Sequence, residues 1–177
     1  MATDRVHITS SLRDKLIRAV CERYPRKTYG YLVSDVDAGT ATDFVLFNGN
    51  LRNDPSWQPE FHAYGRYFVE HDDAGFVATP EESWRVQKEM WARGVFEVAV
   101  FHSHQRHPAN FSQIDYELHV QRFESLWHAV ISMRNPVQPQ LRAFDVSRAG
   151  VRELGIEFIS VAASTPRVEE ALCTPSS

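Results

Sequence analysis

The sequence predicts an α/β or α+β fold in which a twisted, mixed β-sheet is flanked by helices. Short apolar runs of strand type and amphipathic helical stretches follow one another without strict alternation, which is typical of this class. A length of 177 residues and a hydrophobic content of 43% suffice for one buried core. We therefore expect a single domain over residues 1–163 and a flexible C-terminal tail over residues 164–177.

The first half of the chain contains one clear helix between predicted strands. Residues 6–8 form a short opening strand, and the helix after it is predicted to be capped by Ser11 with Asp14 and to end before Pro25. The elements expected next are strands at 30–34 and 43–47, a long surface loop at 48–66 and a short strand at 67–69.

The second half contains the best-marked helix of the sequence. Thr79 is its predicted N-cap, Pro80 and Glu82 lie in its first turn, and Gly94 ends it. An apolar strand at 95–101 leads into the sequence His102-Ser103-His104, and Ser112 is the predicted cap of a third helix that ends near residue 125. Strands at 127–133, 141–146 and 156–161 are expected to complete the sheet.

Two histidines and one aspartate form the most informative motif. His102 and His104 are two residues apart on an extended segment, so their side chains point to the same side of it. Asp115 follows after ten residues, in the first turn of the predicted helix. Two imidazoles and one carboxylate are the ligands of a hydrolytic zinc site, which keeps one position open for a water molecule. The spacing therefore predicts a catalytic metal centre.

Composition excludes several functional classes. The formal net charge of −4 argues against a protein that binds nucleic acid or a membrane surface. Two cysteines, Cys21 and Cys173, provide no disulfide framework, and a polar N-terminus without a long apolar run indicates no signal peptide or membrane span. We expect a cytoplasmic protein, and the sequence leaves its oligomeric state open.

The motif resembles that of the JAMM/MPN metalloprotease-like domains, in their small stand-alone bacterial form. The resemblance covers residues 6–161 and rests on His102-Ser103-His104, the ten-residue spacing, and Ser112 three residues before Asp115. Weaker similarities occur at Arg52-Asn53-Asp54-Pro55 and at Arg142-Ala143-Phe144. The resemblance implies a cytidine-deaminase-like sandwich with one catalytic Zn²⁺.

The resemblance also implies roles for these residues. His102, His104 and Asp115 would bind the zinc ion, and Ser112 would donate a hydrogen bond to the oxyanion of a tetrahedral intermediate. Proteins of this family resemble isopeptidases that cut after the C-terminal glycine of ubiquitin-like proteins. The implied partner is therefore a ubiquitin-like or sulfur-carrier protein, or else a small amide in a biosynthetic pathway.

Two positions depart from the family pattern: Gln105, where the family usually has proline after the second histidine, and Lys27. The catalytic glutamate of the family lies three residues before a glycine, and here Lys27 occupies that position before Gly30. Either the usual base is missing, or a desolvated Lys27 beside a cation becomes neutral and acts as the base. Other glutamates are expected to be surface charges, and strand alternation turns one of them, Glu97, away from His102.

Two hypotheses follow from these residues. The first is a zinc-dependent hydrolase of amide or isopeptide bonds with altered proton-transfer groups, which the complete ligand set favours. The second is a non-catalytic MPN-like binding module that keeps the zinc ion and uses its groove to hold a protein, which Lys27 favours.

Overall fold

The computed structural model describes residues 4–35, 39–63, 65–71, 74–123 and 125–160. Over these residues, eight strands form one mixed sheet in the order β3-β1-β8-β7-β6-β5-β2-β4. Three neighbouring pairs are parallel (β1 with β3, β1 with β8, and β5 with β6) and the others are antiparallel. The strands are β1 (Arg5–Thr9), β2 (Tyr29–Ser34), β3 (Thr40–Ala41), β4 (Asp43–Leu46), β5 (Phe96–His104), β6 (Trp127–Ser132), β7 (Gln140–Ser147) and β8 (Gly150–Ile159).

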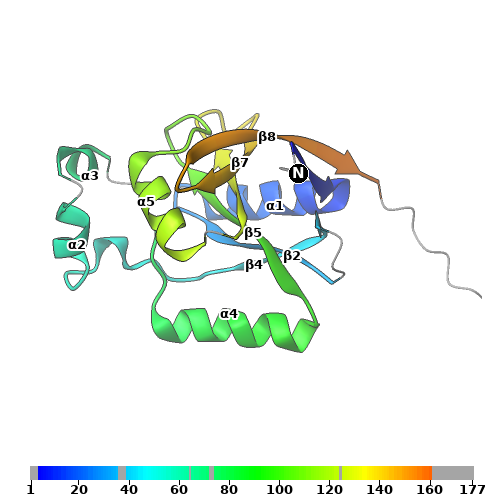
Figure 1. Ribbon diagram of the computed structural model, residues 1–177, viewed down its shortest axis with the longest axis horizontal. Helices are drawn as coiled ribbons and strands as arrows, with labels where there is room; N and C mark the ends of the chain where they lie inside the picture. Colours follow the sequence, from blue (N-terminus) through cyan, green and yellow to red (C-terminus); the bar gives the residue numbers. More distant parts are fainter. Residues whose placement is uncertain (1–3, 36–38, 64, 72–73, 124, 161–177) are drawn as a thin grey trace, which may run out of the picture.

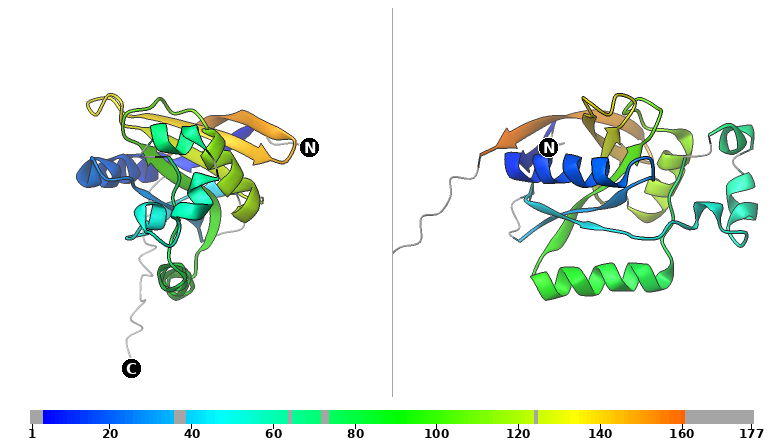
Figure 2. Two further views of the ribbon diagram at one scale, coloured as in Figure 1. Left: turned by 90° about the vertical axis from the view of Figure 1, so that its left-hand side faces the viewer. Right: turned by 180° about the vertical axis from the view of Figure 1, so that it is seen from behind.

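Helices cover both faces of this sheet, as the sequence predicts. Figure 1 shows α1 and α4 on opposite sides of the central strands, and Figure 2 shows the same layers from two further directions. The helices are α1 (Ser10–Arg23), α2 (Gln58–His62), α3 (Arg66–Glu70), α4 (Pro80–Arg93) and α5 (Gln113–Arg122), with a 3₁₀ turn, η1, at Leu51–Asn53. The expected tail at 164–177 lies outside the described residues.

Helix α1 covers one face because its apolar residues recur at helical spacing. Leu12, Leu16 and Val20 are buried in the same cluster as sheet residues that include Leu32 and Phe101. The helix begins two residues earlier than expected, so the predicted cap at Ser11 is wrong. The actual N-cap is Thr9, whose hydroxyl accepts a hydrogen bond of 3.2 Å from the backbone of Leu12.

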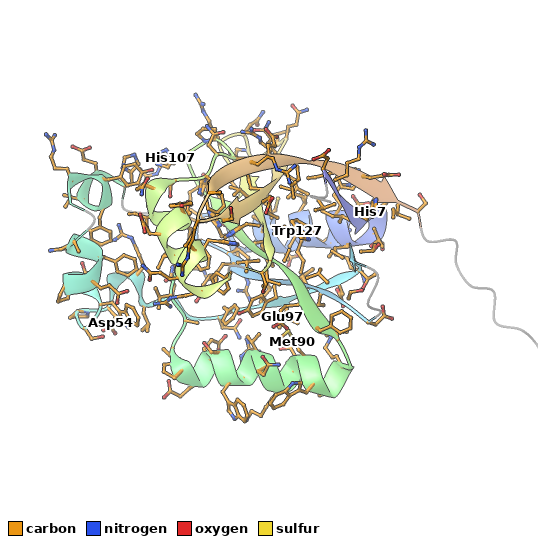
Figure 3. All side chains as sticks on the ribbon, in the orientation of Figure 1. His7, Asp54, Met90, Glu97, His107 and Trp127 are labelled. Carbon is orange, nitrogen blue, oxygen red and sulfur yellow. The ribbon has the colours of Figure 1, made fainter. Side chains whose placement is uncertain are left out.

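Helix α4 covers the opposite face and begins and ends where the sequence predicts. The hydroxyl of Thr79 accepts a hydrogen bond of 3.0 Å from the backbone of Glu82, and Gly94 ends the helix with a positive φ of 63°. Its residue Met90, labelled in Figure 3, is buried against the sheet. The tryptophans of the same helix, Trp84 and Trp91, are instead exposed and stack edge to face.

The segment before α4 departs most from the prediction. The expected loop at 48–66 contains η1 and α2, and the strand predicted at 67–69 is part of helix α3. The rings of Phe61 and Phe68 stack with their centroids 5.1 Å apart and are buried in one cluster with Ile114 and Leu118 of α5. Burial of the aromatic rings between short helices therefore outweighed the strand propensity of the sequence at 67–69.

Strand β5 is longer than predicted and carries both histidines of the motif. It continues through His102 to His104, and its register with the parallel strand β6 pairs His102 with Val130. The adjacent helix α5 packs over this face through Tyr116 and Val120. The motif thus lies where the end of a central strand meets the first turn of a helix. Among the described residues, no helix is both long enough and apolar enough to cross a membrane.

Candidate metal centre

The three predicted ligands meet in the interior of the molecule. His102 and His104 extend from the same face of β5, and Asp115 reaches them from the first turn of α5. Their side chains are almost fully excluded from solvent, with exposed fractions of 0%, 6% and 1% for His102, His104 and Asp115. Tertiary packing therefore gathers three polar groups that the chain separates by up to thirteen positions.

The start of α5 holds Asp115 in place through a reciprocal cap. The hydroxyl of Ser112 accepts a hydrogen bond of 3.1 Å from the backbone of Asp115. In return, Oδ2 of Asp115 accepts hydrogen bonds from the Ser112 hydroxyl and, at 3.3 Å, from its backbone. The predicted cap is confirmed, and it fixes the carboxylate relative to the helix axis.

The donor atoms of the triad converge on one point. Nε2 of His102 and Nε2 of His104 are 2.9 Å apart, and Oδ2 of Asp115 lies 3.4 Å from the first and 3.3 Å from the second. All three donor atoms lie within 4.8 Å of one another. Two imidazole nitrogens and one carboxylate oxygen at this spacing fit a zinc ion with one position left for a small ligand.

Two further observations fit a metal ion at this point. Oδ1 of Asp115 is buried and has no hydrogen-bond partner among the described residues, which is costly for a carboxylate unless a cation compensates it. Nδ1 of His104 lies 2.9 Å from the carbonyl oxygen of Pro108, so it carries the hydrogen and donates. The Nε2 lone pair of His104 is then directed at the centre of the triad.

The electrostatics keep the ligands in the protonation states that bind metal. Burial lowers the pKa of His102 to about 4, although the charge of Asp115 opposes this shift. Burial by itself raises the pKa of Asp115, but His102, His104 and Lys27 outweigh it and hold that pKa well below its usual value. At neutral pH His102 is therefore neutral and Asp115 is ionised.

Lys27 lies beside the triad, as the sequence comparison with the family glutamate predicts. Its positive charge acts on both His102 and Asp115, and its ammonium donates a hydrogen bond of 3.3 Å to the carbonyl of Gly75. The ammonium also lies 5.8 Å from the centre of the Phe76 ring, which packs 5.2 Å from the His102 ring. A cation therefore lies near the triad, and its charge acts on two of the three residues.

Two cavities lie near the triad, and the smaller one is lined by a triad residue. One of about 140 Å³ is lined by both His104 and Ser112, so the Ser112 hydroxyl lies in the wall next to a ligand. The other, of about 630 Å³, is lined by Lys27 and by Gln105, the residue after His104. In the structure the Ser112 hydroxyl donates to Asp115, so it must rotate before it can donate to a substrate oxygen.

The other glutamates considered from the sequence lie away from the centre. Glu97 is exposed near the start of β5 (Figure 3), and its charge acts on Tyr31 rather than on the triad. Glu60 lies 3.9 Å from Arg122, and Glu70 pairs with Arg66 at 2.8 Å. Glu22 is exposed on α1. Each of the four therefore has a surface position.

Sequence reasoning missed two histidines that adjoin the centre. His128 and His119 are completely buried, and Nε2 of His128 lies 2.7 Å from Nδ1 of His102. One signal was available, because His119 follows Asp115 by four residues and therefore shares its helix face. The position of His128 depends on the parallel pairing of β5 with β6, which the sequence did not predict.

Comparison with known proteins identifies the family. The model of the prokaryotic homologs of the JAB domain matches residues 9–147, whereas no curated protein gives a significant match. A solution structure of a Desulfitobacterium hafniense protein is 22% identical, with a TM-score of 0.65 over 89% of this chain and 95% of that one. A Salinibacter ruber protein is 20% identical, with a TM-score of 0.54 over 91% and 95%.

A third solved structure bears a JAB1/MPN name. It is a JAB1/MPN domain protein from Archaeoglobus fulgidus, 15% identical, with a TM-score of 0.46 over 85% of this chain and 98% of that one. The family model covers most of the sequence, including all three residues of the buried triad. The chain is a member of the prokaryotic JAB-domain family.

Proposed function

We propose that this protein is a zinc-dependent hydrolase of amide or isopeptide bonds. The observation that carries the proposal is the buried triad itself, with Nε2 of His102, Nε2 of His104 and Oδ2 of Asp115 directed at one point. The unpartnered Oδ1 of Asp115 and the cavity beside Ser112 add to it. A purely structural site would have no need for three buried metal-ligand groups next to a cavity.

We assign separate roles to the residues of the site. His102, His104 and Asp115 hold the ion, which when bound supplies Lewis-acid polarisation of a carbonyl group and activation of water. The Ser112 hydroxyl rotates from Asp115 and donates a hydrogen bond to the carbonyl oxygen as negative charge develops on it. Burial of the triad excludes bulk water and strengthens these interactions.

Proton transfer is the step for which the chain has an unusual residue. A charged Lys27 cannot accept the proton of the attacking water. If the field of the nearby cation keeps the amine of Lys27 neutral, that amine takes the water proton and, as the ammonium, delivers it to the leaving amine. Lys27 is placed for this role, since its charge acts on His102 and Asp115.

The substrate that we propose is the C-terminal segment of a ubiquitin-like or sulfur-carrier protein, or a small amide. Membership of the prokaryotic JAB-domain family supports this choice. The cavity of about 630 Å³ that Lys27 lines is large enough for several atoms of such a tail.

A second function is favoured by one observation. The ammonium of Lys27 lies where a hydrolase of this type would use a carboxylate, so the chain would serve as a non-catalytic binding module that retains zinc. In that case the cavity lined by Lys27 holds part of a partner protein without cutting it.

Cleavage of a defined fusion protein tests the proposal. The substrate is a sulfur-carrier protein that ends in Gly-Gly and is extended by a short peptide, and mass spectrometry follows its products. The hydrolase predicts cleavage after Gly-Gly by the zinc-loaded protein and none by Asp115→Ala. Binding of the fusion by both proteins without any cleavage would establish the binding module instead.

A further inference from the structure

Four buried histidines form a continuous chain that begins at the metal centre. Nε2 of His104 is 2.9 Å from Nε2 of His102, and Nδ1 of His102 is 2.7 Å from Nε2 of His128. Nδ1 of His128 is in turn 2.9 Å from Nδ1 of His119. The exposed fractions of His102, His119 and His128 are 0%, and that of His104 is 6%. Only the first two rings belong to the triad.

Each contact in this chain requires one nitrogen with a hydrogen and one with a lone pair. A neutral imidazole has one of each, so the state of one ring determines the state of the next. His104 donates from Nδ1 to Pro108, which leaves a lone pair on its Nε2. In metal-free protein, Nε2–H of His102 then donates to His104, Nε2–H of His128 donates to His102, and Nδ1–H of His119 donates to His128.

A metal ion is incompatible with that arrangement. Nε2 of His102 must offer its lone pair to the ion, so the hydrogen of this ring has to be on Nδ1. Nδ1–H of His102 then donates to Nε2 of His128, and Nδ1–H of His128 donates to Nδ1 of His119. His119 must carry its own hydrogen on Nε2. Every ring stays neutral, and the direction of every hydrogen bond beyond the triad is reversed.

The far end of the chain permits both directions. Nε2 of His119 is buried and makes no hydrogen bond to a described residue, whereas the backbone of Leu126 acts on the same ring. This nitrogen can therefore carry a lone pair in the metal-free protein and a hydrogen in the metal-bound protein. If His119 donated from Nε2 to a fixed acceptor, its Nδ1 would always accept, and the first direction would be impossible.

We propose that His128 and His119 are positioning residues of the metal centre, which hold His102 in the tautomer that ligates through Nε2 and reverse their own hydrogen bonds when the ion binds. The proposal rests on zinc binding by the triad but not on hydrolysis. Partners of ligating histidines orient the ring, and their loss typically weakens metal binding about 10–100-fold.

Histidine ¹⁵N NMR spectra of the whole protein test the reversal directly, because nitrogen shifts and couplings show which ring nitrogen carries the hydrogen. In metal-free protein we expect hydrogens on Nε2 of His102, Nε2 of His128 and Nδ1 of His119. Addition of Zn²⁺ should move the hydrogens of His102 and His128 to Nδ1 and that of His119 to Nε2. Zinc binding without a tautomer change at His128 or His119 would overturn the proposal, as would failure to bind zinc.

Competition with a chromophoric chelator measures how tightly variants of these histidines bind Zn²⁺. His128→Leu removes the acceptor for His102 and should weaken Zn²⁺ binding about 10–100-fold. His128→Gln places a carbonyl oxygen near the same point and should recover most of the affinity. The matched control is His7→Leu, since His7 is partly exposed on β1 and pairs with Glu157.

The outcomes separate this proposal from the hydrolase. If His128→Leu binds zinc as tightly as the unchanged protein, His128 only fills the core and the proposal is wrong. If His128→Leu does not fold, affinity is compared between His128→Gln, His119→Leu and His7→Leu. A confirmed reversal in a protein that cleaves no amide would leave the positioning role intact and refute the hydrolase alone.

Discussion

The hydroxyl of Ser112 donates a hydrogen bond to Oδ2 of Asp115, the carboxylate oxygen that faces both histidines of the triad. The same hydroxyl accepts from the backbone of Asp115 at 3.1 Å. Ser112 is therefore both the cap of α5 and a hydrogen-bond partner of a triad residue. The two roles make different predictions, because a cap affects stability and an oxyanion donor affects turnover.

Ser112→Ala should lower turnover of the proposed substrate about 10²–10³-fold, since an oxyanion donor acts mainly in the transition state. Loss of the cap should reduce the free energy of unfolding by about 1 kcal/mol. Enzyme kinetics and thermal unfolding measure the two effects separately.

The control for this variant is Thr79→Ala, which removes the equivalent cap of α4 at a position outside the triad. It should lose about the same stability and no turnover. Equal turnover in both variants would show that Ser112 acts as a cap alone.

Lys27→Glu places a carboxylate where the family has its base. If the missing glutamate limits the reaction, this variant should cleave a Gly-Gly-linked amide faster than the unchanged protein. If Lys27 is an adapted base or acid, turnover of the native substrate should fall. An unchanged rate with both substrates would mean that Lys27 takes no part, despite the effect of its charge on Asp115.

Zinc content tests the ligand set without any substrate. The purified protein should contain close to one Zn²⁺ per chain, because the donor atoms of His102, His104 and Asp115 converge on one point. Asp115→Ala should lower that content markedly in elemental analysis. A chain that stays zinc-free after reconstitution would contradict the metal centre.

The buried histidines make the stability of the zinc-free protein depend on pH. Burial lowers the pKa of His102 and of His119 to about 4, and it lowers that of His128 well below 6.5. Between pH 6.5 and about 4 the unfolded chain therefore binds protons that the folded chain does not. Each histidine contributes stability that is present above pH 6.5 and decreases by about 1.4 kcal/mol per pH unit below it.

Chemical denaturation of zinc-free protein at several pH values measures this effect. The free energy of unfolding should fall steeply between pH 6.5 and 5, and His128→Gln should reduce the slope. A pH-independent free energy over this range would contradict the assignment of neutral, buried rings.

A tight backbone contact explains why residue 30, three positions after Lys27, is a glycine. A Cβ atom on Gly30 would lie 2.1 Å from the carbonyl oxygen of Val45 on the neighbouring strand β4 and 3.0 Å from the Phe101 ring. Gly30→Ala should therefore lower the free energy of unfolding by at least about 3 kcal/mol. In the control Gly49→Ala the added Cβ meets no atom within 4 Å, so the free energy of unfolding in denaturant should stay close to that of the unchanged protein.

Local signals in the sequence were sufficient for most elements and for the triad of His102, His104 and Asp115. The cap at Thr79 and the stop at Gly94 define α4, because both depend on residues within a few positions of the helix ends. The spacing from His102 to Asp115 predicted the triad, since a strand end followed by a capped helix brings these residues together. The position of Lys27 beside the triad followed from its place in the family pattern.

Tertiary structure alone decided the remaining features. The aromatic segment at 67–69 has strand propensity, yet it is helical because Phe68 packs on Phe61 in a cluster with residues of α5. The histidine chain exists because β5 and β6 pair in parallel at one register, and because α5 lies over them. Register and helix docking depend on contacts between distant segments, so no local pattern specifies that His128 meets His102.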